Sequence, residues 1–170
     1  MNEEFFQRTT IEVAENLLGM LLCRKMADES VQRCLIREVE VYDGVEDKAS
    51  HAHKGKTKRN AVMFGPGGYW YVYLCYGMHW MLNLVTEKEG YPAAILIRGA
   101  GDYGGPGVLT KKLNISHSLN AKLCSEQSGL WIEKNLASHP YTTLRTPRIG
   151  IDYAGEWALA PLRLKMAERC

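Results

Sequence analysis

The sequence lacks the signatures of several large protein classes. Its five cysteines are odd in number and widely spaced, with no C-x-x-C pair, which argues against a zinc ribbon or a dithiol redox centre. No G-x-x-x-x-G-K-[ST] segment occurs, so there is no phosphate-binding loop of that type. The uncharged stretch 65–85 is interrupted by Pro66, His79 and Asn83, so it does not suit a bilayer span, and we expect no membrane partner.

Acidic residues are absent from residues 48–86, and this gap is the most informative one. The segment holds five Lys or Arg residues, whereas the rest of the chain has 16 basic and 19 acidic residues. The net charge of +2 therefore combines a local +5 with −3 elsewhere. A basic segment without acids indicates a polyanionic partner that binds on one face.

The remaining composition is that of an ordinary globular protein. With 170 residues, 46% hydrophobic and 24% charged, the chain predicts a single domain over residues 1–170 that can bury a sizeable core. The acidic N-terminus leads into no long apolar run, so we expect no secretory signal. The cysteines are then expected to be reduced, mostly buried thiols of an intracellular protein, which would act in the cytoplasm or nucleoid of a prokaryote or the nucleus of a eukaryote.

Hydrophobic periodicity predicts a mixed chain with more strands than helices. The capping-box pattern Thr9-x-x-Glu12 and the apolar spacing after it predict a helix over 10–18. Two hairpins are expected, one from strands 20–25 and 31–42 and one from strands 69–75 and 79–86. Residues 43–68 have no clear period and predict a long surface loop. The remaining expected elements are strands at 91–98, 130–133 and 148–151 and a brief helix at 109–113.

The strand that ends in Glu38-Val39-Glu40-Val41-Tyr42 is the first candidate for chemistry. In an extended chain Glu38, Glu40 and Tyr42 share one face, and the two valines face the core. This polar face is either the solvated side of an edge strand or one wall of a cleft. Its position directly before the basic loop favours the cleft.

His51 and His53 form the second candidate, because a His-x-His pair on a strand directs both rings to one side. A metal site with Asp47 nearby is one interpretation, and loop histidines that supply hydrogen bonds or positive charge are the other. No third His or Cys lies near the pair, so we expect no metal.

The third candidate is the hairpin from Tyr69 to Asn83. Tyr69 to Tyr76 contains four tyrosines and a tryptophan, which either fill a core or stack on bases. Next to an acid-free basic loop, this composition is typical of a surface that stacks bases and follows phosphates.

Taken together, these segments resemble the alkyladenine (3-methyladenine) DNA glycosylase family over nearly the whole chain. The matching motifs are Val39-Glu40-Val41-Tyr42-x-Gly44-x-Glu46-Asp47-x-Ala49-x-His51, Thr57-x-Arg59-Asn60, Tyr71-Val72-Tyr73-x-x-Tyr76-Gly77-Met78, Leu96-Ile97-Arg98-Gly99-Ala100 and Arg148-Ile149-Gly150-x-x-x-Ala154-Gly155-Glu156-Trp157. The resemblance implies an α+β fold, a single mixed domain around a curved antiparallel β-sheet with flanking helices and a protruding, DNA-inserting β-hairpin.

The resemblance also implies roles for individual residues. Glu40 matches the catalytic acid that activates water, and Arg98 matches the arginine that helps to position it. The base-binding pocket is matched by Tyr42, His51, Tyr73 and Asn83, and the residue inserted into DNA by Tyr76. We expect the DNA backbone to be contacted by residues from Lys54, Lys56, Lys58 and Arg59.

The implied activity is base-excision repair by a monofunctional glycosylase that needs no cofactor. Such an enzyme flips an alkylated or deaminated purine out of double-stranded DNA and hydrolyses its N-glycosidic bond, leaving an abasic site. The implied substrates are 3-methyladenine, 7-methylguanine, hypoxanthine and ethenoadenine, and we expect a monomer. A non-catalytic relative that only binds damaged DNA is the main alternative, and a metal-dependent hydrolase built on His51 and His53 is another.

Overall fold

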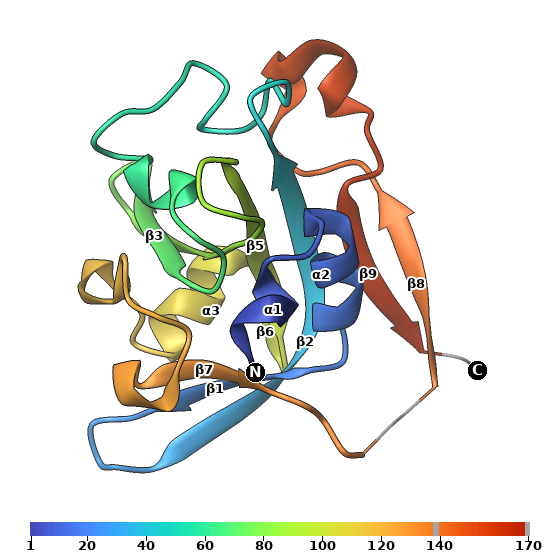
Figure 1. Cartoon of the computed structure of the whole chain (residues 1–170). Coiled ribbons are helices and arrows are strands. Elements are labelled where there is room, and N and C mark those ends of the chain that lie inside the picture. The colour runs from blue at the N-terminus through green and yellow to red at the C-terminus, as the bar shows by residue number, and fades with distance from the viewer. Residues whose placement is uncertain (138–139, 169–170) are drawn as a thin grey trace.

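The computed structural model describes residues 1–137 and 140–168. The chain forms an α+β domain around a strongly curled antiparallel sheet, which confirms the expected fold class (Figure 1). The sheet order is β3-β4-β5-β2-β1-β7, with β6 on β5 and with β9 pairing both β2 and β8. The strands are β1 (Leu21–Lys25), β2 (Val31–Asp43), β3 (Trp70–Cys75), β4 (His79–Val85), β5 (Ala93–Ala100), β6 (Tyr103–Gly104), β7 (Leu130–Glu133), β8 (Tyr141–Thr146) and β9 (Arg163–Glu168).

The helices are short. The α-helices are α1 (Glu3–Phe6), α2 (Thr10–Leu17) and α3 (Pro106–Lys112), and the 3-10 helices are η1 (Ala61–Phe64), η2 (His117–Leu119), η3 (Glu126–Ser128) and η4 (Asp152–Ala158). Helices α2 and α3 pack into the main core, whereas η1 and η4 pack with smaller clusters of buried residues. In Figure 1, α2 lies in front of β2, and its buried residues Val13, Ala14 and Leu17 pack into the main core with the apolar face of β2. Burial of this apolar stripe stabilises a helix that is too short to persist alone.

A bulge in the long strand β2 changes which of its alternate residues face the core. Ile36 and Val39 are three positions apart, yet both are fully buried in the main core, because the pairing with β5 shifts between Ile36 and Val39. An unbroken strand would place residues 36, 38 and 40 on one face. The bulge therefore turns Glu38 and Glu40 away from the core, a use of bulges that is common beside functional sites.

The β3–β4 hairpin has a tight turn with an exposed tip. Cys75 pairs with His79, and the N–H of Met78 donates to the carbonyl of Cys75 at 3.1 Å. The loop between the paired residues consists of Tyr76, Gly77 and Met78, and both Tyr76 and Gly77 have positive φ, 50° and 69°. Tyr76 is 88% exposed, so a backbone conformation that is unfavourable for tyrosine presents the ring to solvent.

Most sequence-based expectations for the elements are confirmed. The helix near 10–18, both hairpins, the long loop and the strands near 91–98 and 130–133 are present, and the brief helix is present as α3. The prediction of a strand at 148–151 is wrong, because Arg148 turns inward and Gly150 has a φ of 76°. The nearby strand is β8, which ends at Thr146. The sequence patterns also gave no indication of α1, β8 and β9.

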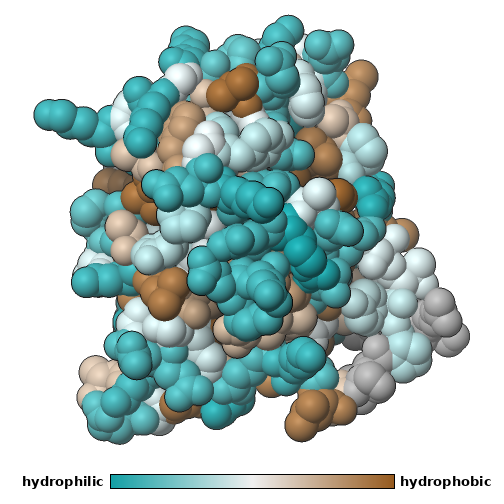
Figure 2. Space-filling model, in the orientation of Figure 1, coloured by the Kyte–Doolittle hydropathy of each residue, from teal (hydrophilic) through white to brown (hydrophobic). Residues whose placement is uncertain are grey.

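The surface and the cysteines give two further observations. Hydrophilic side chains cover most of the face in Figure 2, and apolar residues form separate small areas on it. No helix within residues 1–137 and 140–168 has the length and apolar character that a membrane crossing requires. The four described cysteines are free thiols: Cys23 and Cys34 are buried and Cys75 and Cys124 are partly exposed, while Cys170 lies outside the described residues.

Candidate active site

The end of β2 presents a buried carboxylate to a cavity. The side chain of Glu40 is 1% exposed, because this part of β2 lies between β5 and β9 and is not an edge strand. Glu40 therefore does not belong to a solvated polar face, and the cleft interpretation of this strand is confirmed.

Three groups on different segments hold the Glu40 carboxylate. The Tyr42 hydroxyl donates to Oε2 at 3.0 Å, and the backbone N–H of Ile149 donates to Oε1 at 2.8 Å. Arg98 Nη1 lies 3.5 Å from Oε1. A buried carboxylate needs such partners, and together they fix its orientation.

Arg98 is positioned in turn by a second acid on the same strand face. Its Nε donates to Glu38 Oε1 at 3.1 Å, and Arg163 Nη1 donates to the same oxygen at 3.1 Å. The structure therefore brings Glu40 and Arg98 together as expected, although the shorter contact of Arg98 is with Glu38. Glu38 acts as the bridge that holds Arg98 beside Glu40.

The cavity next to Glu40 has a volume of about 460 Å³, and several aromatic rings line it. All four residues expected in a base-binding pocket line it, and so do Glu40, Arg98 and Tyr76. These lining residues are Glu40, Tyr42, His51, Tyr73, Tyr76, Asn83 and Arg98. A cavity of this size, with aromatic rings beside polar and charged groups, suits a planar heterocyclic ligand.

Tyr71 lines the same cavity and was missed by sequence reasoning. Its hydroxyl is 2.9 Å from His51 Nδ1, and its ring centroid is 5.2 Å from that of Tyr73. The His51 and Tyr73 centroids are 4.5 Å apart, so the three rings form one wall. The alternation of Tyr71 and Tyr73 along β3 is the signal that could have identified Tyr71.

The environment of this wall favours uncharged side chains. Desolvation, and secondarily the Arg59 charge, lower the pKa of His51. Burial raises the pKa of Tyr71 to about 12, and burial together with the Glu40 charge raises the pKa of Tyr42. At neutral pH the wall therefore consists of neutral imidazole and phenol groups, and Tyr42 keeps the proton that it donates to Glu40.

Asn83 is fixed by the backbone of the hairpin. It is 3% exposed, and its Nδ2 donates to the carbonyl of Tyr71 at 3.1 Å and to that of Met81 at 3.3 Å. With its amide group held by two carbonyls, Asn83 has a fixed orientation at the cavity wall.

The basic loop divides into residues that reach the cavity and residues that stay in solvent. Arg59 lines the cavity, lies 5.2 Å over the Tyr73 ring and donates to the carbonyl of Leu74 at 3.1 Å. Lys54, Lys56 and Lys58 are exposed, and Lys56 lies 5.6 Å over the ring of Phe64. Arg59 is therefore part of the pocket mouth, and the sequence alone did not distinguish it from the three exposed lysines.

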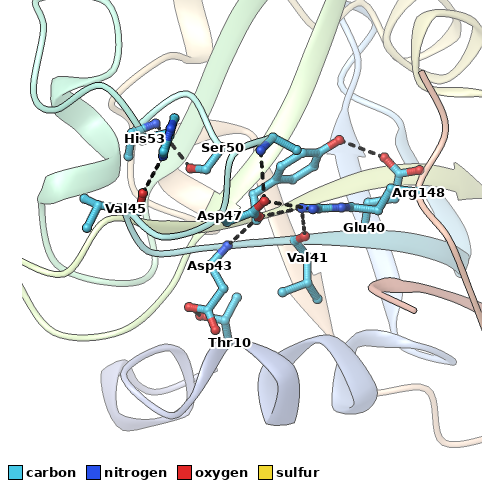
Figure 3. Close-up of polar contacts among 12 residues, drawn as sticks. Thr10, Glu40, Val41, Asp43, Val45, Asp47, Ser50, His53 and Arg148 are labelled. Atoms are coloured by element: carbon cyan, nitrogen blue, oxygen red, sulfur yellow. Dashed lines mark hydrogen bonds and ion pairs between the residues drawn. The ribbon is translucent and has the colours of Figure 1, made fainter. Parts of the chain in front are cut away.

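The two histidines of the His-x-His pair do not converge. His51 Nδ1 lies 2.9 Å from the Tyr71 hydroxyl. His53 Nδ1 lies 2.7 Å from the carbonyl of Val45, and Figure 3 shows His53 directed toward Val45. Within the described part of the chain there is no group of three or more His, Cys, Asp or Glu residues that could hold a metal ion.

A buried ion pair behind the cavity was also missed as a functional feature. Arg148 and Asp47 form a bidentate pair, with Nη1–Oδ2 at 2.5 Å and Nη2–Oδ1 at 2.8 Å, and both side chains are fully buried (Figure 3). Arg148 directly precedes Ile149, whose N–H binds Glu40. The pair thus joins the start of the basic loop to the segment that supports the carboxylate.

A cavity that places aromatic rings beside one buried carboxylate suits an enzyme that binds a planar ring next to a general base. Comparison with known sequences then identifies the family: the model for methylpurine-DNA glycosylase (MPG) matches residues 4–102 and 103–169. The chain belongs to the methylpurine-DNA glycosylase family.

Three curated relatives share the name "Putative 3-methyladenine DNA glycosylase". The relative from Methanocella arvoryzae (strain DSM 22066 / NBRC 105507 / MRE50) is 43% identical over 94% of this chain and 88% of its own length. The one from Legionella pneumophila (strain Lens) is 44% identical over 94% and 90%, and the one from Wolbachia pipientis wMel is 42% identical over 94% and 89%. This chain therefore corresponds to nearly the full length of each relative.

Proposed function

We propose that this protein is a monofunctional DNA glycosylase of base-excision repair. It would act as a monomer inside the cell on double-stranded DNA, flip an alkylated or deaminated purine into the cavity and hydrolyse the N-glycosidic bond. Family membership supports this activity. The observation that carries it is the Glu40 carboxylate, which is buried at an aromatic cavity and held there by Tyr42, Ile149 and Arg98.

Glu40 serves in this proposal as the general base for the attacking water. Hydrolysis of a glycosidic bond through an oxocarbenium-like state normally uses two carboxyl groups, one of which protonates the leaving group. A purine alkylated at N3 or N7 is already cationic and needs no such acid. One carboxylate then suffices to activate water and to stabilise the positive charge that develops on the sugar.

The aromatic wall explains how damage would be recognised. Electron-rich faces of Tyr42 and Tyr73 attract a cationic base by ~0.5–2 kcal/mol more than a neutral one. The neutral form of His51, favoured by its lowered pKa, avoids repulsion of such a base. Asn83 would limit binding of guanine by occupying the space that its exocyclic amine needs.

Tyr76 is proposed as the residue that fills the gap left in the duplex. Base flipping has a cost of ~a few kcal/mol, and an inserted aromatic ring recovers part of it by stacking. The support is the 88% exposure of Tyr76 at the hairpin tip, directly beside the cavity that it lines.

The assignment of Glu40 is tested by Glu40→Gln, which keeps the size of the side chain and removes its charge. We expect base release from a duplex with one 7-methylguanine or 3-methyladenine to fall by at least ~1000-fold in single turnover, since the base that activates water is lost. Binding to the same duplex should persist. Glu46→Gln is the matched control, because Glu46 is exposed on the following loop. Near-normal release by Glu40→Gln would contradict the proposal.

The alternative functions give different outcomes in the same assay. A non-catalytic DNA-binding relative would bind damaged duplex without base release by the wild-type protein. A metal-dependent hydrolase would lose activity on chelation. A lysine nucleophile, for which Lys54, Lys56 and Lys58 are the nearby candidates, would leave a borohydride-trapped adduct, whereas a monofunctional enzyme leaves none.

A further inference from the structure

The Tyr42 ring lies between the cavity and the guanidinium of Arg148. Arg148 Cζ is 4.7 Å from the centroid of Tyr42, over the ring face. Tyr42 lines the cavity, while Arg148 does not and is fully buried. Arg148 therefore contacts the face of Tyr42 that is turned away from the cavity.

A cation in this position opposes the binding of another cation on the opposite face. Two positive charges would then share one π-system, although cation–π attraction depends on its negative face. A base stacked at the usual ~3.5 Å would lie about 8 Å from the guanidinium. Only the tyrosine ring separates the two charges, so bulk water does not screen them.

Asp47 cancels this opposing charge. Its two oxygens accept both terminal nitrogens of Arg148, and they also accept the backbone N–H groups of Ala49, at 3.0 Å, and Asp43, at 3.3 Å. Arg148 Nη1 also donates to the carbonyl of Val41 at 2.7 Å, which keeps the guanidinium against the ring. The pair is thus held in place and is close to neutral as a unit.

We propose that Asp47 sets the preference for cationic over neutral bases, by neutralising Arg148 behind the Tyr42 wall. Asp47 touches neither the cavity nor the reacting atoms, so it acts as a specificity-determining residue through Tyr42. Glu40 and Arg98 also face the bound base, but they are held by each other and by Glu38, and Asp47 takes no part in these contacts. This inference rests on the proposed glycosylase activity and adds to it the residue that determines charge selectivity.

The test compares two lesions in otherwise identical duplexes, cationic 7-methylguanine and neutral hypoxanthine. The quantity measured is the ratio of their kcat/KM values, and, in a Glu40→Gln background, the ratio of their Kd values. Asp47→Asn leaves Arg148 uncompensated and should lower the preference for 7-methylguanine by roughly 10- to 30-fold, as expected for two charges about 8 Å apart at an effective dielectric of about 20 to 30. Arg148→Gln removes the cation and should keep the ratio at or above that of the wild type. The double variant should return to the wild-type ratio.

A purely structural role for the pair predicts another pattern. Both lesions would then be affected in parallel, and the ratios would stay constant in Asp47→Asn, which would overturn the inference. A ratio below wild type in Arg148→Gln would also overturn it. If a single variant does not fold in buffer, the ratios are measured in sucrose, which stabilises the folded state and leaves the charges unchanged. A double variant whose ratio departs from that of the wild type would also overturn the inference. If the wild-type protein released no base from any lesion, the proposed function would fail instead, and the Kd ratios would still test the role of Asp47.

Discussion

Removal of one partner of the Asp47–Arg148 pair should destabilise the protein far more than removal of both. Asp47→Asn leaves a buried guanidinium that still donates to the Val41 carbonyl but has no counter-charge, and Arg148→Gln leaves a buried carboxylate with two backbone donors. A buried charge without its partner typically costs ~3–5 kcal/mol. Replacement of both charges by neutral side chains costs much less, because no charge remains to be desolvated.

These values translate into measurable shifts for a chain of this length. At ~2–4 °C per kcal/mol, each single variant should lower Tm by ~6–20 °C. The double variant should lose at least ~2 kcal/mol less than the sum of the single losses, and this difference is the coupling energy of the pair. Thermal unfolding followed by circular dichroism measures the Tm shifts, and urea unfolding of the wild type and the three variants measures the free energies.

The exposed pair Arg33–Glu133 provides the control. Its Nε–Oε2 distance is 3.1 Å, but the two side chains are 49% and 31% exposed, so the coupling energy should be below ~1 kcal/mol. Equal coupling energies for the two pairs, or single losses at Asp47 and Arg148 that simply add, would refute the argument that this pair is a buried, shared support of the site.

Three further predictions concern DNA binding and pH. Tyr76→Ala should weaken binding of a damaged duplex by at least ~10-fold, whereas Met78→Ala, at 71% exposure on the same tip, should have a smaller effect; equal effects would argue against insertion of the Tyr76 ring. Neutralising Lys54 and Lys58 should lower the affinity for all duplexes alike. The slope of log affinity against log salt concentration should become shallower by up to ~0.9 for each phosphate that is no longer neutralised. A sequence- or lesion-specific effect would contradict this role. The pKa of His51 is lowered in the folded protein, so protonation favours the unfolded state and stability should fall as pH decreases below about 6.5. His51→Gln should remove that part of the pH dependence of urea unfolding. In the wild type, protonated His51 should also lower affinity for 7-methylguanine duplexes at low pH, and the variant should not show this loss. An unchanged pH profile would show that His51 does not titrate in this range.

Local patterns were sufficient to predict most elements of this fold. The helix at Thr10–Leu17 and both hairpins follow from apolar spacing and turn residues, which act over a few residues. The strands Tyr141–Thr146 and Arg163–Glu168 were missed because exposed and half-buried residues predominate in them, so the apolar alternation is weak. They become strands because they pair with each other and because β9 also pairs with β2.

The site was predictable in its residues and less so in its contacts. The resemblance pointed to Glu40, Arg98 and the pocket residues, and the structure brings them to one cavity. The partnership of Asp47 with Arg148 joins positions 101 residues apart, and no local pattern indicates it. The bulge in β2 was equally hidden, because its effect is to change which residues face the core between Ile36 and Val39.

The charges around the cavity explain how Glu40, the proposed general base, can lie next to a surface that binds DNA. A solvated carboxylate next to the basic loop would repel phosphates, but the Glu40 side chain is 1% exposed and lies beside Arg98. Asp47, at the start of the loop, is matched by Arg148 in the same way. Both of these acids are thus compensated locally by an arginine from a distant segment, which leaves the exposed lysines of the loop to determine the field toward DNA. The local charge of +5 in the sequence therefore acts at the surface, while the carboxylates of Glu40 and Asp47 stay buried.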